Sequence, residues 1–431
     1  MADQEEYHKI ITKINAMAPT VPSLARVGMI REILSWLGNP DKKVRMIHIA
    51  GTNGKGSTGA MLAKVLNEND YHVGHFSAPA VNDDRDVISV DGEVIDEASV
   101  VQIVREIGDQ IKQHGGDFTT LGKFEWWVLI GLVYFSKREL SFVVLEASNG
   151  GHIDATNAIL NPFMVVFTKI SLDNIGISGK TLEQVATDMA EIIKPGALVV
   201  SYPGQDLEVL RILKDKAANV EANWNTLPTP NITVLSSAPQ GLHLNINDLT
   251  DIYLSLTGNY QANNLNTVVQ IIELLRSKGF RLAKDRTASA LAHVSIPGRM
   301  EYNADRNILY DGAHNPVGIS ALANSIKAWH LPFKPTFVLG LMNDKNAHDI
   351  IDEIARIAAT IIAVTPDEEG AMTADELAAY VVMNANVDVE IADDPSAAIQ
   401  LARRNRESSK ALIVVTGSFF TLRAIFNEDE V

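Results

Sequence analysis

Residues 44–66 read VRMIHIAGTNGKGSTGAMLAKVL and carry the pattern that decides the fold. The compact apolar run 44–50 ends at a glycine-rich turn. The residues that follow place Met61, Leu62, Val65 and Leu66 on one face of an expected helix. Further apolar runs typical of strands lie at 72–76, 141–147, 163–170 and 197–202, and helical spacing lies at 97–113 and 181–193. Strands that alternate with helices predict a parallel sheet covered on both faces.

The later part of the chain predicts two further pieces of structure. Residues 232–257 contain three short alternating strands, which indicate a small antiparallel flank. Beyond it, strands are expected at 307–311, 335–340, 359–364 and 411–416. We therefore expect an α/β protein with a P-loop-containing parallel-sheet ATPase domain over 1–296, antiparallel flank included, and a smaller doubly wound Rossmann-like domain over 297–431.

Composition restricts the classes of function. The chain of 431 residues has a formal net charge of −16, which argues against a general nucleic-acid or membrane-surface binder. It has no cysteine, so disulfides, thiolate catalysis and zinc–cysteine sites are excluded. The apolar run FEWWVLIGLVYF at 124–135 is too short to span a bilayer. We expect a cytoplasmic, monomeric protein that acts on small molecules, with no nucleic-acid or membrane partner.

The glycine-rich turn 51–57 is a candidate phosphate loop. Its binding residues would be Thr52, Asn53, Gly54, Lys55, Gly56 and Ser57. Glycines let backbone N–H groups turn towards phosphate oxygens, and the N-terminus of the following helix adds partial positive charge. The Lys55 ammonium can neutralise phosphate charge, and the hydroxyl of Ser57 or Thr58 can ligate Mg²⁺. A turn that only joins strand to helix is the alternative, which a lysine between two glycines disfavours.

Six segments together support a family resemblance that spans about residues 25–425. The spelling GTNGKGS at 51–57 and DGAHNP at 311–316 resemble the signatures of folylpolyglutamate and dihydrofolate synthases, which belong to the Mur-ligase-like ATP-dependent amide ligases. Weaker matches follow in the expected order: YQANN at 260–264, PGRME at 297–301, and the pair Asp344-Lys345 with Thr416-Gly417-Ser418.

The resemblance implies both a reaction and residue roles. ATP would phosphorylate a folate carboxylate, and the amine of L-glutamate would then attack the acyl phosphate. The acceptor would be a reduced folate or dihydropteroate. Asn264 would contact the adenine or the phosphates, Arg299 would clamp phosphate through its planar fork, and Asp311 would contact the ribose. His314 would act in catalysis together with Lys55 and Glu146.

The segment VLEASNGGHIDATNAI at 144–159 resembles the metal-binding segment of the family and keeps Glu146 as the expected Mg²⁺ ligand. Other family positions differ. Asn174 stands where the family has a metal-binding histidine, Ala78 stands at a serine ligand, and Met189 stands at a lysine that becomes carbamylated and holds a second ion. With Ser57, Glu146 and Asn174 as ligands, we expect one Mg²⁺ rather than two, because a thioether is a poor ligand for a hard cation.

Two alternatives remain open at this point. The altered metal positions, and a loop at 80–95 that differs from the family's version, suit a catalytically weak folate- or nucleotide-binding paralogue. A Mur-type amino-acid ligase acting on another carboxylate is the second alternative. The intact ATP-binding segments favour an active ligase of the folate branch.

Overall fold

The computed structural model describes residues 2–17, 20–148, 150–172, 179, 181–343 and 347–429. Its tertiary contacts divide the chain into two compact units that are interleaved in sequence. Unit 1 comprises Met1–Ala80, Asp84–Pro230 and Asn263–Leu291, and unit 2 comprises Val81–Asp83, Asn231–Ala262 and Ala292–Val431. The boundary between residues 296 and 297 stays a prediction about independently folding domains.

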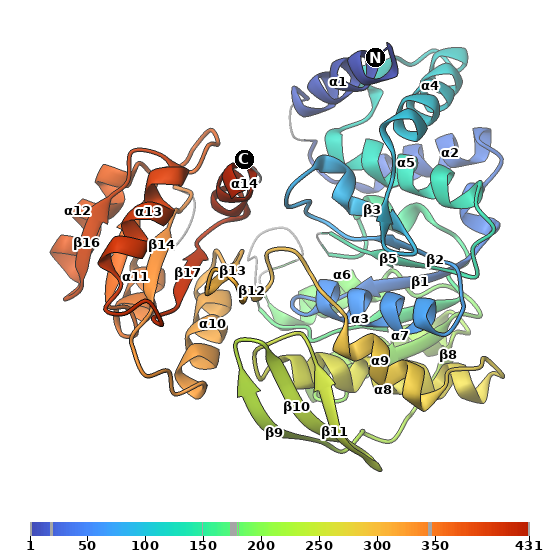
Figure 1. Ribbon diagram of the computed structural model, residues 1–431. Coiled ribbons are helices and arrows are strands. Elements are labelled where there is room, and N and C mark those ends of the chain that lie inside the picture. Colours follow the sequence, from blue (N-terminus) through green and yellow to red (C-terminus); the bar gives the residue numbers. More distant parts are fainter. Residues whose placement is uncertain are drawn as a thin grey trace. The chain divides into compact units, whose positions relative to one another are not determined.

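Unit 1 is built on a largely parallel sheet. Its strands are β1 (Arg45–Ala50), β2 (Val73–Phe76), β3 (Ile88–Val90), β4 (Glu93–Val94), β5 (Phe142–Glu146), β6 (Met164–Phe167), β7 (Leu198–Ser201) and β8 (Asn223–Trp224). Their order across the sheet is β4-β3-β2-β5-β1-β6-β7-β8, in which β3 and β4 form an antiparallel edge (Figure 1). The expected parallel sheet is confirmed, with β1 at its centre.

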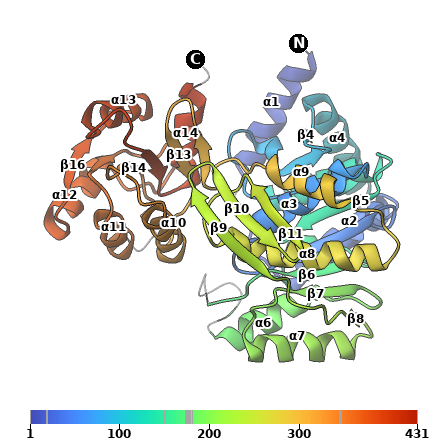
Figure 2. The same cartoon turned by 60° about the horizontal axis from the view of Figure 1, so that its bottom comes forward.

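The helices of unit 1 are α1 (Ala2–Asn15), α2 (Leu24–Trp36), α3 (Lys55–Glu68), α4 (Glu97–Gln113), α5 (Lys123–Ser136), α6 (Leu182–Ala190), α7 (Leu207–Asn219), α8 (Gln261–Ser277) and α9 (Lys284–Ala292). The unit boundary crosses α8 near its start, and the last residue of α9 falls in unit 2. Short 3₁₀ turns lie at Pro40–Lys42, Asp84–Val87, Phe118–Thr120 and Ala155–Ala158. One face of the sheet packs on α1, α2, α4 and α5, and further along on α6 and α7. Figure 2 shows α6 and α7 beside β7 and β8. Helix α3 contacts β1, β2 and β5. Both faces are therefore covered, as the near-continuous apolar strands require.

Unit 2 contains an antiparallel sheet and a doubly wound sheet. The antiparallel sheet consists of β9 (Ile232–Ala238), β10 (Gly241–Ile246) and β11 (Leu249–Leu254). The second sheet has β12 (Glu301–Asn303), β13 (Ile308–Asp311), β14 (Thr336–Leu339), β15 (Thr360–Ala363), β16 (Asp388–Ile391) and β17 (Ile413–Thr416), in the order β12-β13-β17-β14-β15-β16. The Trp329 indole N–H donates to Ser237 Oγ at 3.0 Å, which ties the antiparallel sheet to the rest of unit 2.

Helices cover both faces of the second sheet. They are α10 (Pro316–Ala328), α11 (Ala347–Ala355), α12 (Ala374–Asn384), α13 (Pro395–Asn405) and α14 (Phe419–Asp429). Leu309, Phe337 and Val414 point to α10, α11 and α12, whereas their neighbours Val338 and Val415 point to α13 and α14. This alternation confirms the predicted Rossmann-like arrangement.

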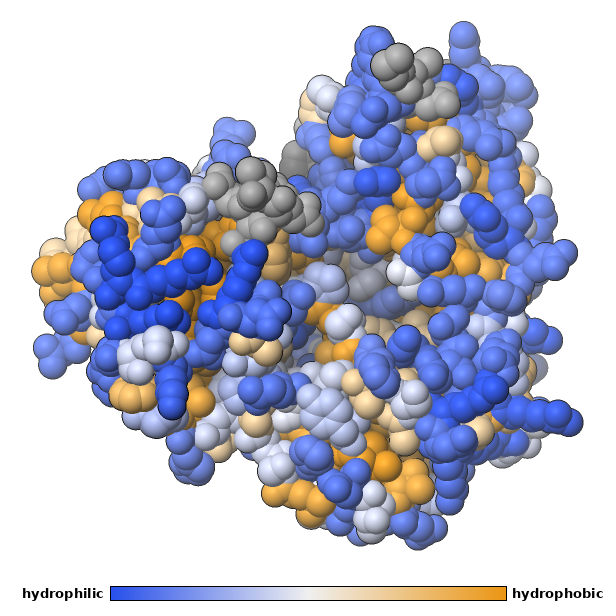
Figure 3. All heavy atoms as spheres, in the orientation of Figure 1, coloured by the Kyte–Doolittle hydropathy of each residue, from blue (hydrophilic) through white to orange (hydrophobic). Residues whose placement is uncertain are grey.

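The surface carries both hydrophilic and hydrophobic residues. The face shown in Figure 3 is mainly hydrophilic, with separate smaller hydrophobic areas. The apolar run 124–135 lies in α5, which is buried inside unit 1. Within the described residues, no helix combines the length and apolarity that a membrane span needs.

Candidate active site

The turn between β1 and α3 has a shape that only glycine allows at two positions. Gly51 has φ +147°, and a Cβ there would overlap the Thr168 side chain. Gly54 has φ +88° and forms the N-cap of α3. The turn is also paired with the chain after β6, since the Lys169 carbonyl accepts from the N–H groups of Thr52 and Asn53 at 3.0 and 3.3 Å. The backbone is therefore fixed in a conformation that suits phosphate binding.

Lys55 begins α3 and folds back over the turn. Its ammonium donates to the Gly51 carbonyl at 2.7 Å and to the Thr52 carbonyl at 3.4 Å. Thr52 in turn accepts from the Ser171 N–H at 3.0 Å and donates to the Ser171 carbonyl at 2.9 Å. The positive charge is thus held at the loop where a phosphate would bind, next to a helix N-terminus.

Asn264, from the first turn of α8, lies against the same loop. A Cβ on Gly54 would overlap the Asn264 Oδ1 atom, so the two residues are in direct contact. Helix α8 begins at Gln261, within the YQANN segment. The structure therefore brings Asn264 together with Gly54 and Lys55 although about two hundred residues separate them in sequence.

Glu146 ends β5 beside this loop and is only 3% exposed. Its Oε1 atom lies 3.1 Å from His75 Nε2, and its Oε2 atom lies 3.8 Å from the position a Cβ would take on Gly56. Glu146 thus faces the first turns of α3. His75 was not predicted, although the expected strand at 72–76 contains it.

The first turn of α3 also supplies oxygen donors. Thr58 is fully buried, and its Oγ1 atom has no hydrogen-bond partner among the described residues. Ser57 precedes it in the same turn. Among the described residues, no group of three or more His, Asp or Glu side chains could enclose a metal by itself. A carboxylate and hydroxyls fit a Mg²⁺ that completes its coordination with phosphate oxygens and water.

The segment after β5 is held by a buried polar network. Asp154 accepts from the Ser148 N–H at 2.9 Å and from the Thr156 hydroxyl at 2.6 Å. Since that hydroxyl donates to Asp154, His48 Nε2, at 2.8 Å from it, must be the donor of the next bond. Burial, aided by the charge of Lys194, lowers the pKa of His48 to about 3, so its ring is neutral.

The position at which the family carries a lysine, Met189, and the two acidic residues near it have structural surroundings that do not suit a metal ion. Met189 is buried in an apolar cluster with Val185, Ile192 and Ile193. Asp188 accepts from the Gly151 N–H at 2.8 Å, and Glu191 accepts from Lys216 at 2.7 Å. These two carboxylates therefore already have structural partners. Asn174 and the pair Asp344-Lys345 lie outside the described residues.

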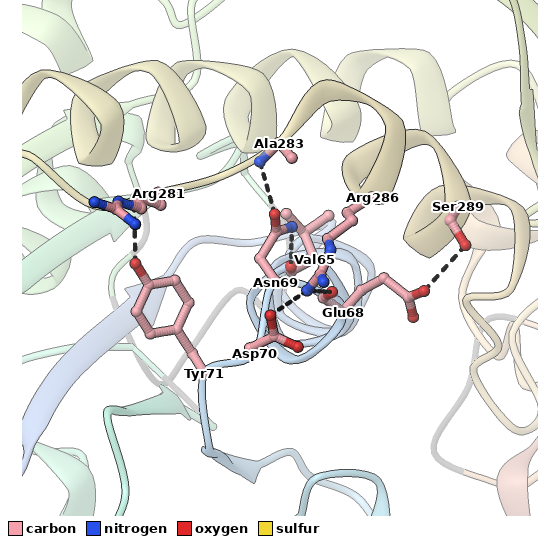
Figure 4. Close-up of polar contacts among 9 residues, drawn as sticks. All are labelled: Val65, Glu68, Asn69, Asp70, Tyr71, Arg281, Ala283, Arg286 and Ser289. Carbon is pink, nitrogen blue, oxygen red and sulfur yellow. Dashed lines mark hydrogen bonds and ion pairs between the residues drawn. The ribbon is translucent and has the colours of Figure 1, made fainter.

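The far end of α3 is anchored to the α8–α9 connection (Figure 4). Asn69 Oδ1 accepts from the Ala283 N–H at 2.7 Å, while its amide donates to the Val65 carbonyl at 2.8 Å. The Tyr71 hydroxyl accepts from the Arg281 N–H at 2.9 Å. Arg286 pairs with Asp70, and Ser289 donates to Glu68 at 3.1 Å. The phosphate-loop helix is thus contacted by α8 at one end and by α9 at the other.

In unit 2, Asp311 ends β13 and is 7% exposed. Its carboxylate accepts from the N–H groups of Met300 at 2.9 Å and Ala313 at 3.0 Å. Burial raises the pKa of Asp311 from its ordinary value of 3.8 to about 6, against the opposing charge of Arg299. The Tyr260 phenol lies near this carboxylate. Burial raises the pKa of Tyr260, and the negative charge of Asp311 raises it further.

Arg299 and His314 flank a common aromatic ring. The Arg299 guanidinium lies 4.4 Å from the Phe419 ring centroid, and the His314 ring centroid lies 6.3 Å from it. His314 Nδ1 also lies 2.8 Å from the Gly312 carbonyl, which makes Nδ1 the protonated nitrogen. Asn315 caps α10 with its side chain, and Pro316 occupies the first helical position. The DGAHNP segment therefore joins the expected strand β13 to α10 through a short turn.

The predicted site residues thus form two groups, each within one unit. Unit 1 gathers Lys55, its loop, Glu146 and Asn264, and unit 2 gathers Arg299, Asp311 and His314. Three further side chains belong to these groups: His75, Thr58 and Tyr260. Of the three, only Thr58 was expected from the sequence as a site residue, as an alternative hydroxyl donor; the places of the other two depend on contacts between distant segments.

Comparison with known proteins agrees with this geometry. Residues 298–419 match the model of the Mur ligase glutamate ligase domain. The dihydrofolate synthase/folylpolyglutamate synthase of Bacillus subtilis is 28% identical over 411 residues, which cover 93% of this chain and 94% of the relative. The folylpolyglutamate synthase of Lacticaseibacillus casei is 29% identical over 370 residues, which cover 82% and 85%.

Solved structures extend the likeness to the whole chain. The Mycobacterium tuberculosis folylpolyglutamate synthase complexed with ADP and AMPPCP has a TM-score of 0.85 and 26% identity, covering 99% of this chain and 98% of that protein. The Thermotoga maritima folylpolyglutamate synthase has a TM-score of 0.84 and 25% identity, covering 98% and 96%. Along nearly its whole length this chain therefore resembles the folylpolyglutamate and dihydrofolate synthases, and its residues 298–419 form the glutamate ligase domain of the Mur ligases.

Proposed function

We propose that this enzyme uses ATP to add L-glutamate to a folate, with a reduced folate or dihydropteroate as the acceptor. The observation that carries the proposal is the loop 51–57, closed over by Lys55 and facing the buried Glu146. The acidic, cysteine-free chain suits a cytoplasmic monomer that acts on small molecules.

The reaction needs two steps because a carboxylate and an amine do not condense in water. A carboxylate oxygen of the folate attacks the γ-phosphorus of ATP, and ADP leaves. The glutamate nitrogen then attacks the acyl carbon, loses a proton, and phosphate departs as the amide forms. Negative charge concentrates on the phosphoryl oxygens in the first step, so cationic and N–H donors supply most of the stabilisation.

We assign residue roles on that basis. Lys55 and the backbone N–H groups of 54–57 bind the phosphates, and Asn264 holds the nucleotide against the loop. Arg299, kept in place by the Phe419 ring, clamps the transferring phosphoryl group. Asp311 binds the ribose hydroxyls. His314 would contact the phosphoryl group through Nε2, since Nδ1 is engaged by the Gly312 carbonyl.

We propose a single Mg²⁺, held by Ser57, Glu146 and Asn174. When bound, this ion would neutralise charge on the ATP phosphates. A second ion has no support at Met189, whose thioether lies in an apolar cluster. A titration of Mg²⁺ into nucleotide-saturated protein should therefore give one tight site per chain.

The double change Met189→Lys with Asn174→His tests this account. In buffer with bicarbonate, which can carbamylate the lysine, it should raise glutamate-dependent ADP release. Without bicarbonate, the buried ammonium should instead lower the free energy of unfolding by about 3 kcal/mol or more. Met189→Leu with Asn174→His is the matched control and should show neither effect. A parent enzyme that turns over briskly, with no gain in the double variant, would contradict the single-ion account.

The acceptor is tested by a panel. ADP release that depends on L-glutamate should appear with tetrahydrofolate or dihydropteroate and should be absent with a UDP-muramyl acceptor. A second candidate function, nucleotide and folate binding with little turnover, is favoured by the apolar residues at Ala78 and Met189. Tight ADP binding without glutamate-dependent turnover on any acceptor would decide for that candidate.

A further inference from the structure

His75 and Glu146 come from different strands and meet on one face of the sheet. In the parallel pairing of β2 with β5, His75 lies opposite Val144. Glu146 is two residues beyond Val144, so both side chains point to the same face, which is the face that α3 covers. His75 Nε2 and Glu146 Oε1 lie 3.1 Å apart, and both side chains are largely shielded, with 16% and 3% of their surface exposed.

Helix α3 is shaped to leave room for this pair. A Cβ on Gly59 would lie 2.6 Å from Glu146 Oε1 and 2.9 Å from His75 Nε2. Any side chain at position 59 would therefore push the imidazole and the carboxylate apart. Both carboxylate oxygens lie near Gly56 in the first turn of α3, with Oε2 at 3.8 Å and Oε1 at 4.0 Å from the position that a Cβ would take there.

We propose that His75 is a positioning residue for the catalytic metal site. It donates a hydrogen bond from Nε2 to Glu146 Oε1, fixes the orientation of the carboxylate beside the first turn of α3, and thereby leaves Oε2 as the oxygen that can ligate the cation. The inference rests on the proposed metal role of Glu146. Carboxylates that bind metals are commonly held by such an outer hydrogen bond, and loss of the outer partner typically weakens metal affinity about 10- to 100-fold.

The role of His75 has particular weight in this chain. Ala78 and Met189 offer no ligand atoms that suit Mg²⁺, so the site depends on few protein oxygens. With fewer ligands, the orientation of Glu146 decides a larger share of the binding. A carboxylate without its hydrogen bond could rotate and present either oxygen, at a cost in affinity and in geometry.

The test measures binding rather than turnover. Mn²⁺ is titrated into the full chain saturated with AMPPCP, and free Mn²⁺ is followed by electron paramagnetic resonance. His75→Leu, which cannot donate, should weaken Mn²⁺ binding about 10- to 100-fold. His75→Gln places an amide N–H near the former Nε2 position and should stay within about 3-fold of the parent. Gly59→Ala should also weaken Mn²⁺ binding, because its Cβ would displace the Glu146 carboxylate and the His75 ring.

The control is His72→Leu. It removes a histidine–carboxylate contact of the same kind, His72 with Asp91 at 2.7 Å, on the exposed start of the same strand region. It should leave Mn²⁺ affinity unchanged. Near-ultraviolet circular dichroism of each variant checks that the fold is kept.

The outcomes separate this inference from the proposed function. Unchanged affinity in His75→Leu would overturn the positioning role. A histidine nitrogen coupled to bound Mn²⁺ in the parent spectrum, and lost in His75→Gln, would overturn it too, because His75 would then be a direct ligand. If Glu146→Gln binds Mn²⁺ as tightly as the parent, the metal role of Glu146 itself fails, and with it the basis of both proposals.

Discussion

At the scale of single residues, Lys55 has a position that a structural role does not explain. Its ammonium donates to the Gly51 and Thr52 carbonyls of the loop, and its removal would take no apolar surface out of the core. Lys55→Ala should therefore lower kcat/KM for ATP by about 10²-fold or more, which corresponds to several kcal/mol of transition-state stabilisation. The melting temperature should change little.

Lys64→Ala on the same helix is the matched control, since Lys64 forms a weak surface pair with Glu68, at 3.9 Å. Glutamate-dependent ADP release and thermal melting are measured for both variants. Turnover of Lys55→Ala within a few-fold of the parent would show that the loop is not the phosphate site.

Asp311 predicts a pH dependence of stability. Its pKa is raised to about 6 in the folded chain, so the folded state keeps the proton when the unfolded state has lost it. The free energy of unfolding should therefore fall as pH rises from about 4 to about 6, by about 3 kcal/mol at most, and level off above that window.

Denaturant titrations of parent and Asp311→Asn across this window isolate the effect. The asparagine variant should lack this component of the pH slope, whatever its absolute stability. Equal slopes in both proteins would show that Asp311 titrates normally in the folded state. The proposed ribose contact of Asp311 would then involve an ordinary carboxylate.

At the scale of elements, the two ends of helix α3 have different roles: the first turn carries the proposed phosphate site, and the last turn carries bonds that stabilise the fold. Its first turn carries Lys55 and faces Glu146, whereas its last turn is bonded to the α8–α9 connection (Figure 4). Asn69→Ala should lower the free energy of unfolding by about 1–3 kcal/mol, because the Ala283 N–H loses its acceptor in a partly buried place.

The KM for ATP of Asn69→Ala should stay within about 3-fold of the parent, because the phosphate loop is held separately by Lys169 and Ser171. Ser289→Ala, which removes the hydroxyl that donates to Glu68, is a milder control. A large rise in the KM for ATP without loss of stability would show instead that the Asn69–Ala283 bond influences the conformation of the phosphate loop.

The elements also show what a sequence can predict and what it cannot. Strands β1 and β13 and the loops after them were predicted because glycine, apolar runs and helix caps are local signals. Strand β16 was missed, since an exposed edge strand reading DVEI lacks an apolar run. The His75–Glu146 contact depends on the register between two strands about seventy residues apart, which no local pattern contains.

At the scale of the whole molecule, the proposed site residues are distributed between two compact units. Unit 1 holds the phosphate loop and unit 2 holds Arg299 and Asp311, and the chain passes from one unit to the other several times. If Lys55 and Arg299 act on the same phosphoryl group, as the family resemblance implies, their contributions to catalysis must be coupled. A double-mutant cycle can measure this without any assumption about distance.

Lys55→Ala, Arg299→Ala and the double variant should be compared by kcat/KM for ATP. Each single change should cost about 10²-fold or more, but the double change should cost clearly less than the product, because either loss already disables the same transition state. Arg299→Lys should recover little, since lysine lacks the planar fork and the stacking on Phe419. Arg356→Ala, which removes an exposed pair with Glu353, is the control and should combine with Lys55→Ala additively. Strict additivity between Lys55 and Arg299 would mean that the two cations serve separate steps, and the shared clamp would have to be abandoned.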